Sequence, residues 1–202
     1  ISSGLSGTVN AARAGAEMVP EADVTVVDTK TLSGAEGWQV LAAARAARAG
    51  WTKAHILPLI ERIGAATDTV YTLQTLKYLI HGGRISHLKG LLASMLNIKP
   101  LIGVEKVNGT YTQCGQARTL QGAVLKLADH VARQHAPGSA LRLQVLHGHN
   151  PEGAALLRER LAQIYDCTWL PTGPIAPVLG AHTGPGLVGV AYAPEAAFSE
   201  MP

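Results

Sequence analysis

The sequence has few of the residues on which nucleic-acid-binding proteins depend. Of its 202 residues only one is Phe, five are Tyr and three are Trp, and Lys and Arg are scattered without a basic run. Stacking aromatics and basic patches are the usual marks of a nucleic-acid interface. The formal net charge of +3 is modest. We therefore expect no nucleic-acid partner.

Cysteine and long apolar runs are also scarce. The two cysteines, Cys114 and Cys167, lie 53 positions apart and have no metal-ligand spacing. Two free thiols suit a reducing compartment better than a disulfide scaffold. We therefore predict a cytoplasmic location and no metal site. No uninterrupted apolar run reaches the ~18 residues that a membrane-spanning helix needs, so no transmembrane segment is expected.

The sequence is rich in alternating helix and strand patterns. Helical spacing of apolar residues covers 5–18, 34–49, 52–66, 119–135 and 151–165. Short β-branched or apolar runs that are typical of strands cover 23–29, 69–73, 141–147, 167–170 and 187–192. Asn108-Gly109 predicts the turn of a β-hairpin over 98–112. This alternation predicts an α/β fold. The tail after Pro194 is expected to be loosely ordered, as chain ends often are.

The pattern changes between Leu73 and Pro100, where Gly82-Gly83 interrupts a helical stretch. We place a domain junction there and predict two α/β domains, residues 1–75 and 76–202. The chain opens with Ile1 at what resembles the end of a strand. The N-terminal domain is therefore expected to be incomplete at its N-terminus.

The first eight residues, Ile-Ser-Ser-Gly-Leu-Ser-Gly-Thr, combine hydroxyls and glycines just before a predicted helix. Amides at a helix start, helped by the helix dipole, favour a phosphate or a carboxylate. Ser2, Ser3, Ser6 and Thr8 can add hydroxyl donors to such a site. The alternative is an ordinary serine N-cap, because Ser is common before helices.

Three motifs then follow one another along the chain. They are Ser2-Ser3-Gly4-Leu5-Ser6-Gly7-Thr8; Leu76 to Ser86 (Leu-Lys-Tyr-Leu-Ile-His-Gly-Gly-Arg-Ile-Ser) with Leu96-Asn97-Ile98-Lys99-Pro100; and His182-Thr183-Gly184-Pro185-Gly186. Together they resemble the DegV family of fatty-acid-binding proteins. The resemblance runs from residue 1 to about residue 192.

The resemblance implies two α/β domains with a long-chain fatty acid between them. Its carboxylate would lie near the serine turn, where Ser2 or Ser3 would hydrogen-bond it, and His182 would lie close to the head group. The implied role is a carrier without catalytic activity or cofactor, which hands the acid to a separate ATP-binding fatty acid kinase subunit. A family Thr-Ser-x-Pro segment upstream of the serine turn has no counterpart in these 202 residues.

The fatty-acid tail needs an apolar tunnel, and the stretch before the hairpin offers one. Candidate lining residues are Leu92, Met95, Leu96 and Ile98, and Met95 could adapt to different tails. Simple core packing is the alternative for each of them. Arg84 follows the Gly-Gly break and is a candidate for the surface that meets a partner or an acyl phosphate. The alternative is a solvent-exposed arginine.

Two enzyme hypotheses compete with the carrier. A Ser/Gly turn at a helix start could belong to a kinase-like phosphotransfer subunit that binds a phosphorylated small molecule, but the sequence lacks Gly-x-x-x-x-Gly-Lys-Ser/Thr and paired carboxylates for magnesium. A serine hydrolase would need a Gly-x-Ser-x-Gly turn, which is absent, and Asp28 as the acid that orients His182. The binding and carrier function is favoured over both.

Overall fold

The computed structural model describes residues 1–88, 90 and 98–202. Its elements, in chain order, are α1 (Thr8–Glu17), α2 (Ser33–Arg48), α3 (Lys53–Ala66), β1 (Asp68–Thr72), α4 (Lys77–His81), β2 (Lys99–Val104), β3 (Tyr111–Ala117), α5 (Leu120–Ala132), β4 (Ala140–His147), α6 (Pro151–Ala162), β5 (Asp166–Trp169), β6 (Gly173–Pro174), α7 (Pro177–Thr183), β7 (Val188–Pro194) and the 3-10 helix η2 (Glu195–Phe198). The predicted α/β class is confirmed. None of the helices in the described ranges is long and apolar enough to cross a membrane.

One mixed sheet organises the described chain. Its strand order is β3-β2-β1-β7-β4-β5, with β6 paired to β4. The β3-β2-β1-β7-β4 part is antiparallel, whereas β5 and β6 run parallel to β4. Val70 of β1 lies opposite Gly103 on one side and Val190 on the other. The sheet therefore joins strands from both sides of residue 75, and the division at 75/76 stays a prediction.

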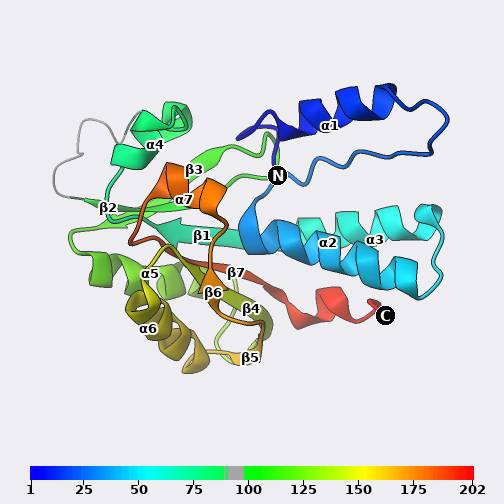
Figure 1. Ribbon diagram of the computed structural model, residues 1–202. Coiled ribbons are helices and arrows are strands. Elements are labelled where there is room, and N and C mark those ends of the chain that lie inside the picture. Colours follow the sequence, from blue (N-terminus) through cyan, green and yellow to red (C-terminus); the bar gives the residue numbers. More distant parts are fainter. Residues whose placement is uncertain (89, 91–97) are drawn as a thin grey trace.

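Alternation along the strands gives the two faces of the sheet different cores. Val70 packs with α5 and α6 on one face, while the next residue, Tyr71, packs on the opposite face. On that opposite face α4 and α7 cover the β1-β2 end, and α2 and α3 pack side by side nearer η2 (Figure 1). The serine turn belongs to the α4 and α7 side, so this face carries the candidate site.

Two expectations are wrong, one about the run 23–29 and one about the C-terminal tail. Residues 23–29 are extended but join no sheet among the described residues, and Val24 and Val27 are 51% and 39% exposed. A buried strand needs both a ladder partner and cover for its side chains, and neither is described here. The tail after Pro194 is ordered: Phe198 of η2 is buried edge-to-face against Trp38 and beneath the Arg142 guanidinium.

Candidate functional site

Ser2 is fully buried, and its hydroxyl is already paired. Its Oγ donates to the Gly109 carbonyl at 2.7 Å and accepts from the Gly4 amide at 3.1 Å. The Ser2 amide donates to the Thr31 carbonyl at 2.8 Å. The first serine is thus tied to two distant segments, the hairpin turn and the loop before α2.

The hairpin turn is itself held by a carboxylate. Glu105 accepts hydrogen bonds from the amides of Val107, Asn108 and Thr110 at 2.8, 3.0 and 3.3 Å. These bonds, with that from Asn108 the largest, lower the pKa of Glu105. Gly109 has φ +66°, and a Cβ added there would lie 1.9 Å from Ser2 Oγ. The turn and the serine loop therefore fit together only with glycine at 109.

Ser3, in contrast, is exposed and faces charged groups. Its amide donates to Asp28 Oδ1 at 3.1 Å, and the Lys30 ammonium lies 3.4 Å from its hydroxyl. Partial burial raises the pKa of Asp28, but hydrogen bonds from Ser3 and Lys30 outweigh that effect and lower it to about 2. Asp28 is thus a carboxylate at neutral pH and already occupies the Ser3 amide. Of the two serines only Ser3 is exposed, and both its side chain and its amide contribute to the lowered pKa of Asp28.

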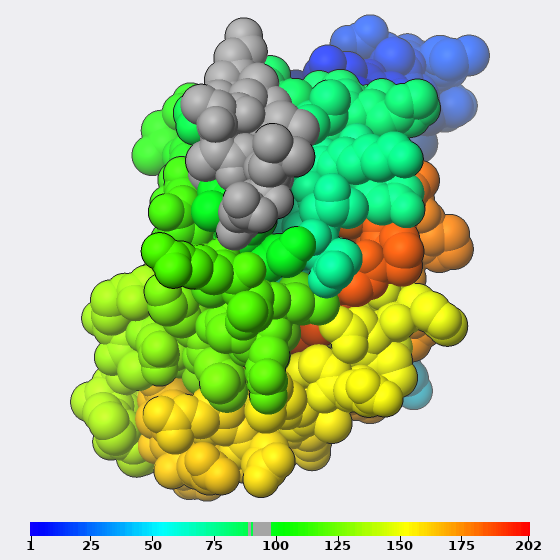
Figure 2. All heavy atoms as spheres, turned by 90° about the vertical axis from the view of Figure 1, so that its left-hand side faces the viewer, coloured from blue at the N-terminus to red at the C-terminus, as the bar shows by residue number. Residues whose placement is uncertain are grey.

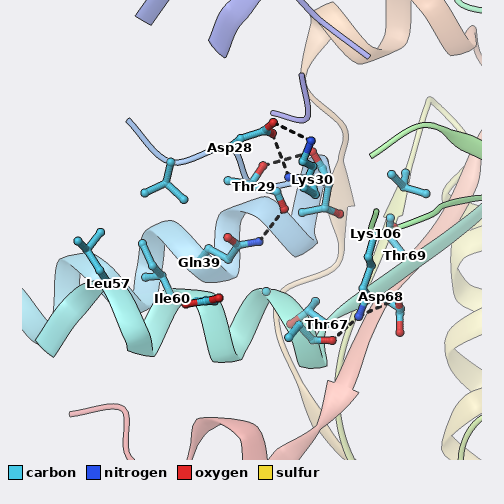
Figure 3. A pocket seen from close by; sticks show the side chains of 16 residues that line it. Asp28, Thr29, Lys30, Gln39, Leu57, Ile60, Thr67, Asp68, Thr69 and Lys106 are labelled. Carbon is cyan, nitrogen blue, oxygen red and sulfur yellow. Dashed lines mark hydrogen bonds and ion pairs between the residues drawn. The ribbon is translucent and has the colours of Figure 1, made fainter. Parts of the chain in front are cut away.

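A cavity of about 520 Å³ opens beside this loop (Figure 3). Two ion pairs line it, Lys30 with Asp28 at 3.1 Å and Lys106 with Asp68 at 3.2 Å. Leu57 and other apolar residues of α3 form another part of its wall. Among the described residues no three His, Cys, Asp or Glu side chains are grouped to bind a metal ion. The cavity therefore combines charged and apolar lining without a metal site.

His182 lies on α7 and packs against the second motif. A Cβ added at Gly82 would lie 2.1 Å from His182 Nδ1. Helices α4 and α7 are in contact, and in Figure 2 the teal-green atoms of the α4 region lie against the orange atoms of α7. His182 Nδ1 is buried and has no hydrogen-bond partner within the described chain. A proton on Nδ1 would lack an acceptor among the described residues, which favours the tautomer with its proton on Nε2.

One apolar cluster brings the three motifs together. Leu5 follows the serines, Leu79 belongs to the second motif, and Leu187 follows the third; all three are buried in the same cluster. Tyr71 and Tyr111 pack edge-to-face in it. Beside them is a small cavity of about 30 Å³, lined mostly by apolar side chains including Leu179 and Leu187. We call this set the leucine cluster: Leu5, Leu32, Tyr71, Leu73, Leu76, Leu79, Leu88, Ile102, Tyr111 and Leu187.

The serine turn also faces Arg84. A hollow of about 240 Å³ is lined by Gly4 to Gly7 on one side and by Gly83, Arg84, Ser86 and His87 on the other. The exposed Arg84 guanidinium donates to the Gly82 carbonyl at 2.7 Å. The predicted head-group turn and the predicted partner-surface residue thus border one hollow.

Comparison with known proteins identifies the family of the chain. The family model of DegV matches residues 1–195. The chain belongs to the DegV family. A DegV domain-containing protein of Deinococcus radiodurans is 39% identical over 196 residues, which are 97% of this chain and 68% of the relative. A second, of Streptomyces coelicolor, is 36% identical and is matched over 94% of this chain and 66% of its own length. The chain thus spans about two thirds of these DegV relatives.

Solved DegV structures share the fold. A Thermus thermophilus DegV family protein, described by its fatty acid binding, superposes with a TM-score of 0.85 at 28% identity, over 96% of this chain and 69% of that one. A Thermotoga maritima protein whose structure reveals a fatty acid binding function gives 0.81 at 27% identity, over 96% and 67%. A Bacillus subtilis DegV, described as a fatty acid binding protein, gives 0.77 at 26% identity, over 96% and 68%.

The predicted tail-lining residues divide into two groups. Leu92, Met95 and Leu96 lie outside the described residues. Ile98 is half-buried and packs against the leucine cluster, of which Leu88 is a buried member. Its role in binding a tail stays a prediction.

The structure adds residues to the site that the sequence alone does not mark. The sequence predicts Gly109 as a turn residue, but no local pattern indicates its contact with Ser2. Lys30 carries no sequence signal of its own, and the sequence suggests Asp28 only as a partner for His182. Its hydrogen bonds in the described chain go to Ser3 and Lys30 instead. One signal in the sequence points to this pair: Asp28 and Lys30 lie at the carboxyl end of the strand-like run 23–29, and ligands in α/β proteins gather at such ends.

Proposed function

We propose that this chain binds a long-chain fatty acid between its predicted domains, 1–75 and 76–202. The carboxylate binds at the serine turn with His182, and the tail enters the leucine cluster. One observation carries the proposal: the hydroxyl-bearing turn and the His182 helix border the same apolar cluster. The DegV proteins of Thermus and Thermotoga, whose descriptions state fatty acid binding, support it.

The chemistry of a fatty acid matches this arrangement. A carboxylate leaves water at low cost only when hydrogen bonds replace its hydration, and the Ser3 hydroxyl and His182 Nε2 are suitable donors. Each buried CH₂ contributes ~0.8 kcal/mol, or on the order of 10 kcal/mol gross for a sixteen-carbon tail, before the cost of association. The 30 Å³ cavity is too small for such a tail as it stands. Tail binding therefore requires side chains of the leucine cluster to move apart.

The proposal assigns no reaction to the chain itself. It acts in the cytoplasm as a carrier that presents the carboxylate to a fatty acid kinase subunit, which supplies ATP. Native mass spectrometry of the purified protein tests the binding step: a retained fatty acid is expected. A protein that is empty, fails to take up added fatty acid and turns over ATP would instead support the phosphotransfer hypothesis.

The two serines should give different phenotypes. Ser3→Ala removes an exposed hydroxyl and should weaken fatty-acid binding by roughly 1–3 kcal/mol, because a carboxylate oxygen loses its donor. Ser2→Ala leaves the Gly4 amide and the Gly109 carbonyl without their buried partner, so it should lower the free energy of unfolding by about 1–3 kcal/mol. Fluorescent fatty-acid titration and urea unfolding of both variants check this. Unchanged affinity in both variants would remove the serine turn from the site.

Substitutions of Arg84 and His182 should also have different effects. His182→Ala should weaken fatty-acid binding by about tenfold, since a head-group donor is lost. Arg84→Ala should leave binding unchanged and reduce kinase-coupled phosphorylation, because an exposed guanidinium is suited to meet an acidic partner surface or an acyl phosphate. Acid affinity and phosphorylation rate are measured for both variants. Loss of acid binding in a folded Arg84→Ala protein would place Arg84 in the pocket and contradict the partner-surface role.

A further inference from the structure

We propose that Lys30 makes the head-group site selective for a carboxylate over an uncharged lipid head group. This inference rests on the proposed function and names what that site recognises. The Lys30 ammonium lies 3.4 Å from Ser3 Oγ and 3.1 Å from Asp28 Oδ2. It is therefore a cation within hydrogen-bonding reach of the hydroxyl that faces the proposed carboxylate.

The backbone directs Lys30 toward Ser3. Lys30 has φ +51°, a left-handed conformation that residues other than glycine rarely adopt. Asp28 Oδ1 accepts from the Lys30 amide at 3.3 Å and from the Ser3 amide at 3.1 Å, so one carboxylate oxygen holds both segments. The Lys30 side chain then passes Gly109, where an added Cβ would lie 3.1 Å from Lys30 Cδ. A residue held in this rarely populated conformation beside the proposed head-group site supports a functional role for Lys30.

The local charges explain why the effect depends on the ligand. Asp28 is ionised and only 13% exposed, and it balances Lys30, which is 37% exposed (Figure 3). A carboxylate bound at Ser3 Oγ would place Lys30 between two anions and gain a charge-assisted hydrogen bond. A lipid alcohol at the same position could use the Ser3 hydroxyl but would gain nothing from the charge. Lys30 therefore contributes to the difference between the two affinities rather than to both equally.

The test compares cis-9-hexadecenoic acid with cis-9-hexadecen-1-ol, each displacing a fluorescent fatty acid from the protein. Lys30→Met should weaken acid binding by roughly three- to tenfold and leave alcohol binding unchanged, whereas Lys30→Arg should retain most of the preference for the acid. Raising the salt concentration should reduce the wild-type preference, because an incompletely buried charge is screened. Asp28→Asn should strengthen acid binding, since it frees Lys30 from its competing anion.

Lys106 provides the matched control. It lines the same cavity, pairs with Asp68 at 3.2 Å and is 42% exposed, but it has no described contact with the serine turn. Lys106→Met should therefore leave the ratio of acid to alcohol affinity unchanged. If the ratio of acid to alcohol affinity were also unchanged in Lys30→Met, because both affinities stayed the same or fell equally, the inference would be overturned while the binding function stands. A wild-type protein that binds no acid would overturn both.

Discussion

Replacing Gly109 by Ala should weaken fatty-acid binding at least tenfold and lower the free energy of unfolding by about 2–4 kcal/mol. Gly109 has φ +66°, which costs an alanine on the order of 1 kcal/mol or more. The new Cβ would also lie 1.9 Å from Ser2 Oγ, and Ser2 is fully buried and cannot move aside. Overpacking of this kind adds typically 1–3 kcal/mol. The clash would break the bond between Ser2 and Gly109 and displace Ser3 with it.

Gly138→Ala separates the backbone cost of a positive φ from the cost of a steric clash. Gly138 has φ +81°, but an added Cβ would meet nothing within 4 Å. It should therefore show only the backbone cost of about 1 kcal/mol and normal fatty-acid affinity. Urea unfolding gives the stability of each variant, and fluorescent fatty-acid titration gives the affinity. If the two variants lost the same stability and both kept their affinity, the contact between Gly109 and Ser2 would have no part in the site.

Local patterns in the sequence predict most of the fold. Asn108-Gly109 correctly predicts the hairpin turn between β2 and β3, because the turn needs a residue with φ > 0 and Gly109 supplies it at φ +66°. The long helices α2, α3, α5 and α6 lie close to their predicted ranges, since a continuous apolar stripe specifies a helix. These features depend on residues that are close together in the sequence, so they can be predicted without knowing how the rest of the chain folds.

Other features depend on contacts that no local pattern encodes. Residues 23–29 have the β-branched composition of a strand, but a strand exists only where another strand pairs with it. The hydroxyl of Ser2 bonds a carbonyl 107 residues away, so its burial could not be foreseen from the turn motif alone. The sequence therefore identifies the pair Ser2-Ser3 without indicating which hydroxyl faces a ligand. The packing indicates Ser3, and this assignment stays a prediction.

Gly82→Ala should weaken fatty-acid binding by about tenfold through His182, a residue 100 positions further along the chain. Gly82 has φ −75°, which any residue adopts, so the substitution carries no backbone strain. The added Cβ would lie 2.1 Å from His182 Nδ1, which is buried between α4 and α7. The imidazole must therefore rotate or shift, and its Nε2 leaves the position from which we propose that it donates to the head group. The stability loss should be about 1–3 kcal/mol.

A double-mutant cycle isolates this contact. Gly82→Ala, His182→Ala and the double variant are compared by urea unfolding, with Gly180→Ala as the control on α7, where an added Cβ meets nothing within 4 Å. Truncating His182 removes the clash, so the double variant should regain much of the stability that Gly82→Ala loses, with a coupling energy of about 1 kcal/mol or more. Gly180→Ala should be neutral or slightly stabilising and leave affinity unchanged. Strict additivity of the unfolding free energies would show that a Cβ at residue 82 does not clash with the His182 side chain, and this would contradict the proposed cause of the binding loss.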